Sequence, residues 1–60
     1  MNKGERVKVK NSQSEFCDET GTIVFVHPEW VHITFDEYNQ HIEYAFRPYE
    51  VEVIEKHENH

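Results

Sequence analysis

With 60 residues, the chain has room for one small domain with a core of roughly ten to fifteen side chains. A core of this size cannot enclose an active site, so we expect a non-enzymatic protein without a cofactor. The formal net charge is −6, and residues 11–60 carry −9 while residues 1–10 carry +3, so most of the surface repels a phosphate backbone.

Five short runs rich in β-branched and aromatic residues are separated by turn residues, which predicts an all-β fold. In the first run, Arg6–Lys10, valines alternate with basic residues, which indicates a half-buried strand with a basic outer face. Residues 11–20 form a long polar loop from which we expect Phe16 to insert into the core. Gly21 is predicted to take a positive φ where the second run begins.

The second run, Thr22–Val26, is apolar at both odd and even positions, which indicates the most central strand and room for a bulge. Pro28 follows it and ends the strand, because proline cannot donate a ladder hydrogen bond.

The third and fourth runs, Val31–Phe35 and His41–Phe46, are predicted to form a hairpin in which Asp36 faces His41. This register places three apolar pairs on one face: Phe35 with Ile42, Ile33 with Tyr44, and Val31 with Phe46. A slip by one residue would mix apolar with charged residues on that face.

The remaining elements complete the predicted domain. Residues 47–50 suit a single 3₁₀ turn, and the last run, Val51–Ile54, can pair with the basic first strand. Lys8 and Lys10 would then face Glu52 and Glu50. We therefore expect a barrel over residues 1–54 and a disordered tail over residues 55–60.

This layout resembles the SH3-like barrel, and more narrowly the KOW-type and the phage- or prophage-encoded small SH3-like proteins. The resemblance rests on segments 4–9, 21–24, 31–36, 46–48 and 51–54, read as G-x-x-V-x-V, G-T-I-V, V-H-I-T-F-D, F-R-P and V-E-V-I. It implies a closed five-stranded barrel with a 3₁₀ turn before the last strand. Nucleic-acid-binding KOW members show a basic, glycine-rich turn, whereas this chain is acidic and has only two glycines.

Two binding hypotheses follow. In the first, aromatic residues at predicted turns form an exposed patch with an acidic rim, which selects basic or proline-rich protein partners. The residues of this patch are Trp30, Tyr38, Tyr49, Glu29, Asp36 and Glu37. The opposing interpretation is structural: Trp30 caps the barrel end and Tyr49 packs beneath the last strand.

The second hypothesis is a nucleic-acid-binding barrel that uses the basic first strand, through Lys3, Arg6, Lys8, Lys10 and Arg47. We expect a protein partner in preference to nucleic acid, no membrane association, and a monomer or weak homo-oligomer.

The cysteine and histidines predict no special chemistry. Cys17 is the one cysteine, so no intramolecular disulfide can form, and we expect a free thiol in a reducing cytoplasm. Its acidic neighbours disfavour a reactive thiolate. The five histidines lack the spacing of a metal site, and we interpret them as surface groups that make the net charge sensitive to pH.

Overall fold

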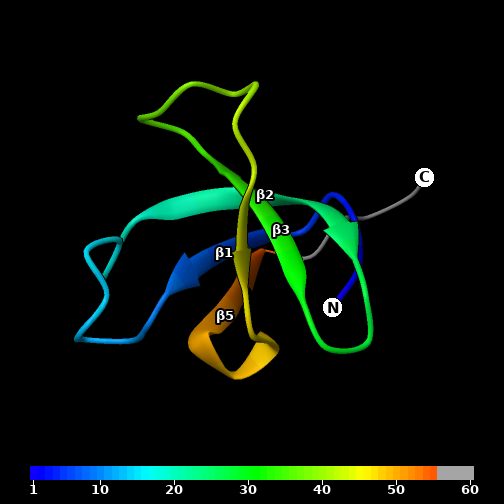
Figure 1. Cartoon of the computed structure of the whole chain (residues 1–60), viewed down its shortest axis with the longest axis horizontal. Helices are drawn as coiled ribbons and strands as arrows, with labels where there is room; N and C mark the ends of the chain where they lie inside the picture. Colours follow the sequence, from blue (N-terminus) through cyan, green and yellow to red (C-terminus); the bar gives the residue numbers. More distant parts are fainter. Residues whose placement is uncertain (56–60) are drawn as a thin grey trace.

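A computed structural model describes residues 1–55, which consist of β-strands joined by turns and loops (Figure 1). Its elements are β1 (Arg6–Val9), β2 (Thr20–Val26), β3 (Val31–Phe35), β4 (Tyr44–Phe46), the 3₁₀ helix η1 (Pro48–Glu50) and β5 (Val51–Glu55). The all-β prediction is confirmed, and each predicted run contains one strand. Within the described residues, no helix is long and apolar enough to cross a membrane.

Some strand bounds differ from those predicted. β2 begins at Thr20, because Thr20 already pairs with Lys8 of β1. β5 extends through Glu55, which pairs with Arg6. The predicted disordered tail therefore begins with a strand residue, and residues 56–60 lie outside the described part of the chain.

The five strands form one antiparallel sheet in the order β4-β3-β2-β1-β5, with β2 at its centre as predicted. The sheet is open, so the predicted closure into a barrel is not what the structure contains. β4 is only three residues long and leads directly into η1, so the chain enters β5 from a turn and not alongside β4.

The open sheet curls around one hydrophobic core. Phe46 of β4 and Val51 of β5 belong to the same buried cluster, although β4 and β5 are the opposite edges of the sheet. In Figure 1, β3 and β4 cross in front of β1 and β5. Each fully buried valine, isoleucine or phenylalanine contributes roughly 1.5–3 kcal/mol through removal of apolar surface from water. The cluster consists of Val7, Val9, Ile23, Val31, Ile33, Phe35, Phe46 and Val51.

Phe16 inserts from the long loop after β1, as predicted. Its ring stacks on Phe35 with centroids 4.9 Å apart and lies 4.8 Å from the ring of Tyr44. Tyr38 and Phe46 complete this aromatic group, at 5.6 and 6.0 Å from Phe16. The loop is therefore anchored to the core by one side chain.

Gly21 lies inside β2 and does not have the predicted positive φ, which within the described residues occurs only at Gly4 and Asp18. The structure shows a different need for glycine. A Cβ atom at position 21 would lie 2.5 Å from the backbone oxygen of Thr34 and 2.6 Å from Cγ2 of Ile33. β2 and β3 approach each other too closely here for a side chain.

A β-bulge interrupts β2, as the sequence had indicated. Ile23 pairs with Ile33, and Phe25 pairs with the very next residue of β3, His32. Val24 is therefore the extra residue. Side chains alternate between the two faces of a strand, so the bulge turns Phe25 from the core side to the solvent side.

The β3–β4 hairpin has the predicted register over part of its length. The predicted pairs of Val31 with Phe46 and of Ile33 with Tyr44 are confirmed. The predicted pairs of Phe35 with Ile42 and of Asp36 with His41 are wrong, because residues 36–43 form a loop and Ile42 is 46% exposed.

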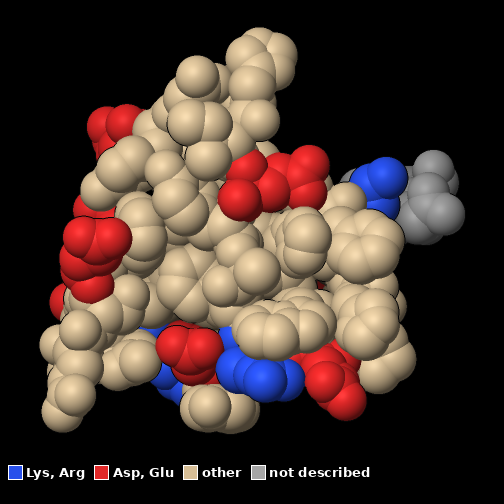
Figure 2. Space-filling view, in the orientation of Figure 1, with Lys and Arg blue, Asp and Glu red and all other residues tan. Residues whose placement is uncertain are grey.

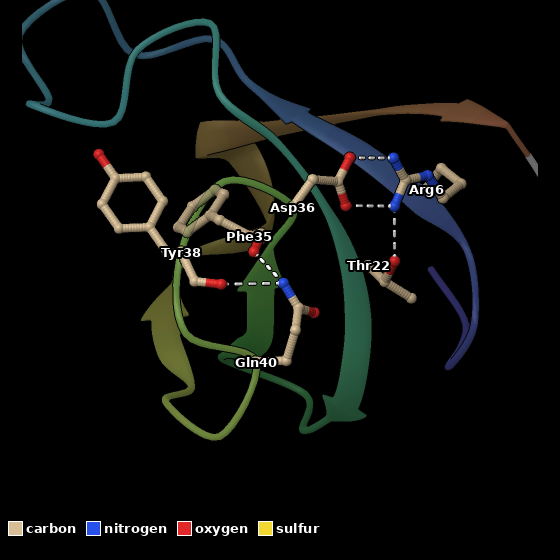
Figure 3. Close-up of polar contacts among 6 residues, drawn as sticks. All are labelled: Arg6, Thr22, Phe35, Asp36, Tyr38 and Gln40. Carbon is tan, nitrogen blue, oxygen red and sulfur yellow. Dashed lines mark hydrogen bonds and ion pairs between the residues drawn. The ribbon is translucent and has the colours of Figure 1, made fainter.

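Side-chain hydrogen bonds explain why the hairpin ends early. The amide of Gln40 donates from Nε2 to the backbone oxygen of Phe35, and the carboxylate of Asp36 binds Arg6 (Figure 3). The backbone N–H of Asp36 donates to the oxygen of Thr20 at 3.1 Å. The chain after Phe35 is thus held toward β1 and β2 and away from β4.

The predicted pairing of the last strand with the first is confirmed. β5 runs antiparallel to β1, and Lys8 faces Glu52. At the end of this pair, the N–H of Lys10 donates to the backbone oxygen of Glu50. The Lys8 ammonium lies 3.7 Å from the carboxylate of Asp18. The carboxylate of Glu50 accepts hydrogen bonds from the backbone N–H of Arg47 and from the side-chain amide of Asn11.

Candidate functional site

The aromatic and acidic residues predicted to form one patch lie in three separate places. Trp30 and Glu29 belong to the β2–β3 turn, whereas Asp36, Glu37 and Tyr38 lie beyond the other end of β3. Tyr38 packs its ring against Phe35, at 5.8 Å between centroids. The single patch predicted from the sequence is therefore not assembled.

Tyr49 occupies the third place, in η1. Its side chain is 75% exposed, so the prediction that it packs beneath the last strand is wrong. η1 begins at Pro48 and consists of a single turn, which leaves Tyr49 exposed to solvent. Tyr49 borders an open pocket of about 380 Å³ with Lys10, Asn11 and Glu50.

A different set of side chains does share one surface, at the β2–β3 hairpin end. The backbones of His27 and Trp30 exchange hydrogen bonds in the turn, at 2.9 and 3.2 Å. Side chains alternate between the two faces of a strand, which places those of His27 and Trp30 on the solvent side. Phe25 and His32, which pair with each other, and Ala45, which pairs with His32, lie on the same side. We call this surface the hairpin face; its members are Phe25, His27, Trp30, His32, Ala45 and Arg47.

Trp30 and Arg47 form one part of the hairpin face. The guanidinium carbon of Arg47 lies 3.9 Å from the centroid of the Trp30 ring, which is a cation–π contact. Arg47 also lies 3.7 Å from a carboxylate oxygen of Glu29. Trp30 remains 38% exposed, so the ring is held in one orientation and still presents area to solvent.

Phe25 and His32 form a second part of the hairpin face. Their rings lie 5.1 Å apart, and Phe25 is 49% exposed. Nδ1 of His32 lies 3.1 Å from a carboxylate oxygen of Glu43, just before β4. The exposed Phe25 thus lies beside an imidazole that is paired with the carboxylate of Glu43.

The space-filling view shows this side of the molecule. Figure 2 shows a broad uncharged area over β3 and β4, with charged side chains along its margins. Exposed apolar side chains of the hairpin face include Phe25 and Trp30, and apolar patches rimmed by polar groups mark interaction surfaces.

The basic residues proposed for nucleic-acid contact do not form a free cationic strip. Arg6 binds Asp36, Lys8 lies near Asp18, and Arg47 lies near Glu29. Among the residues from 1 to 55, ion pairs therefore engage three of the five predicted cations. The remaining two, Lys3 and Lys10, are exposed.

Arg6 and Asp36 shift each other's pKa in opposite directions. The hydrogen bond from Arg6 lowers the pKa of Asp36 below its ordinary value of 3.8. The same bond raises the pKa of Arg6 above its ordinary value. Both groups remain ionised around neutral pH, so this acidic residue is engaged in the fold and is not available to rim a binding patch.

In the part of the chain that the structure describes, no group of three histidine, cysteine, aspartate or glutamate side chains could hold a metal ion. Cys17 lies half-buried in the loop after β1.

Phe25 and His32 were missed at the sequence level, although a signal existed. The run Thr22–Val26 is apolar at both odd and even positions. Odd and even side chains point to opposite faces of a strand, so one of these two sets had to face solvent unless both faces of the sheet were covered. The identity of the exposed residue depends on the bulge position, which the sequence does not specify.

Comparison with known proteins adds no relative: no family model, no curated protein and no solved structure matches this chain.

Proposed function

We propose that the protein is a non-enzymatic binding module that engages a protein partner through the hairpin face. The observation that carries this proposal is the bulge at Val24, which turns Phe25 out of the core to lie, 49% exposed, beside His32. Bulges often re-aim a side chain at functional positions, and burying an exposed phenylalanine in an interface is favourable.

The composition of the hairpin face supports a protein partner. Tryptophan and arginine are enriched among the residues that dominate binding energy, and Trp30 and Arg47 are already stacked. A ring held in place loses little conformational entropy when it binds. Phosphates would meet the carboxylates of Glu29 and Glu43, which favours protein over nucleic acid.

We further propose that the open, curled sheet is a member of the SH3-like class. Its support is the antiparallel pairing of β1 with β5 and the 3₁₀ helix directly before β5. An experimental structure whose sheet order differed from β4-β3-β2-β1-β5 would contradict this assignment.

Affinity capture from a lysate of the native host tests the proposed function. Immobilised wild-type protein is compared with Trp30→Ala and with the matched variant Tyr49→Ala, which removes an exposed aromatic ring that borders Lys10 and Asn11 and is not a member of the hairpin face. We expect a specific partner that Trp30→Ala loses and Tyr49→Ala retains. Equal capture by all three proteins, or no capture above background, would refute the proposal.

A further inference from the structure

Two acidic side chains lie beside the hairpin face and contact different members of it, Glu29 near Arg47 and Glu43 near His32. The carboxylate of Glu29 lies beside Arg47, and Glu43 is four residues before Arg47 on the same segment. Four residues of extended chain span about 13 Å. Phe25, Trp30, His32 and Ala45 are the uncharged members of the face, and the guanidinium of Arg47 stacks on one side of Trp30.

We propose that the hairpin face binds an extended cationic segment in which two arginine or lysine residues, four positions apart, flank one apolar side chain. This inference rests on the proposed protein-binding function. An extended segment places residues 1, 3 and 5 on one side, about 13 Å from first to last. The two cations then reach Glu29 and Glu43, while the middle side chain packs on Phe25 and Trp30.

The acidic groups are available for such an exchange. Glu29 and Glu43 have side chains that are 70% and 50% exposed, and their present contacts are with Arg47 at 3.7 Å and His32 at 3.1 Å. Exposed ion pairs contribute little net energy, so an incoming cation can share these carboxylates. The net charge of −6 accelerates the encounter with a cationic partner.

Trp30 provides a direct readout, because it is the only tryptophan in the chain. The probe is a blocked seven-residue peptide with arginine at its second and sixth positions, leucine at its fourth, and serine or threonine elsewhere. A peptide of the same composition with adjacent arginines and a terminal leucine is the matched control. We expect a saturable change in Trp30 fluorescence with a Kd on the order of 10⁻⁴ M, and at least threefold weaker binding of the control peptide.

Charge variants test the role of the two carboxylates. Glu29→Gln combined with Glu43→Gln should weaken binding of the probe by about threefold to tenfold at low salt, and less at high salt. Glu37→Gln combined with Glu52→Gln removes the same charge away from the hairpin face and should change binding less than twofold. Far-ultraviolet circular dichroism checks that both double variants remain folded.

Several results would overturn the inference. Equal affinity for the two peptides would show that binding reflects general charge attraction and not the inferred pattern. Equal weakening of probe binding by the two double variants would show the same. If these results appear while Trp30→Ala still abolishes partner capture, only the inferred peptide pattern is wrong. If Trp30→Ala leaves capture unchanged, the proposed function is wrong. Tighter binding of a single-stranded oligonucleotide than of the probe peptide, measured by Trp30 fluorescence, would contradict both the inferred peptide pattern and the proposed function.

Discussion

Arg6 and Asp36 are joined by two hydrogen bonds, although they lie 30 residues apart in the chain (Figure 3). Nη1 of Arg6 donates to Oδ1 of Asp36 at 2.8 Å and also to the hydroxyl of Thr22 at 2.8 Å, while Nη2 donates to Oδ2. The contact joins β1, β2 and the end of β3 on the solvent side of the sheet. A bidentate pair fixes geometry better than a single ion pair does.

Asp36→Asn should lower the free energy of unfolding by about 1 kcal/mol, because the amide cannot replace the bidentate carboxylate and both side chains are partly exposed to water. Urea denaturation at neutral pH measures the change. Asp18→Asn is the matched control, since Asp18 is 78% exposed and lies 3.7 Å from its partner Lys8. An equal loss in the two variants would argue against a special role for Arg6.

The same pair predicts a pH dependence of stability. The pKa of Asp36 is lower in the folded than in the unfolded protein, so its contribution is present above the ordinary value of 3.8 and is lost as the pH falls through the folded pKa. The difference in unfolding free energy between the wild type and Asp36→Asn should therefore shrink below about pH 4. Urea midpoints between pH 7 and pH 2.5 measure this, and a difference that grows toward acid would contradict it.

Gly21→Ala should destabilise the fold by about 1–3 kcal/mol, because its Cβ would overlap the backbone oxygen of Thr34. Thermal or urea unfolding measures the loss. Gly4→Ala separates this steric cause from backbone strain, since Gly4 has a φ of 94°. If Gly21→Ala were as stable as the wild type, β2 and β3 could not approach as closely as the structure shows.

Phe16→Ala should cost about 3 kcal/mol, at the low end for phenylalanine truncation because Phe16 is only partly buried. Its ring packs on Phe35 and Tyr44, and no other residue of the long loop belongs to the aromatic group. Tyr49→Ala removes a ring that is 75% exposed and should change stability by less than about 0.5 kcal/mol. Similar losses in both variants would mean that the loop is not anchored through Phe16.

Nucleic-acid binding should be weaker than about 10⁻⁴ M even at low salt, because Arg6, Lys8 and Arg47 already face carboxylates. Fluorescence anisotropy with labelled RNA and single-stranded DNA measures the affinity. Binding in the micromolar range that weakens steeply with salt, and that Lys8→Gln reduces, would restore the nucleic-acid hypothesis.

Much of the fold could be predicted from the sequence, because alternation of apolar and polar residues determines strand position and facing. This is why the pairs of Val31 with Phe46 and of Ile33 with Tyr44 were found. The early end of the same hairpin could not be found, because it depends on a side-chain hydrogen bond from Gln40 to the backbone of Phe35.

The candidate surface was less predictable than the fold. Trp30 and Glu29 were identified because they lie at a turn, but Tyr38 was grouped with them although β3 separates the two positions. Phe25 was missed because its direction depends on a one-residue bulge. The position of a bulge depends on packing across strands, and a linear pattern does not record that packing.

The extra residue at Val24 also divides β2 into two parts with separate roles. Before it, Gly21 and Ile23 are buried, so substitutions at these two positions alter the core. After it, Phe25 and the turn residues are exposed, so they can be exchanged with little effect on folding. The hairpin tip is therefore a natural graft site, at which a new binding specificity could be installed on an unchanged core.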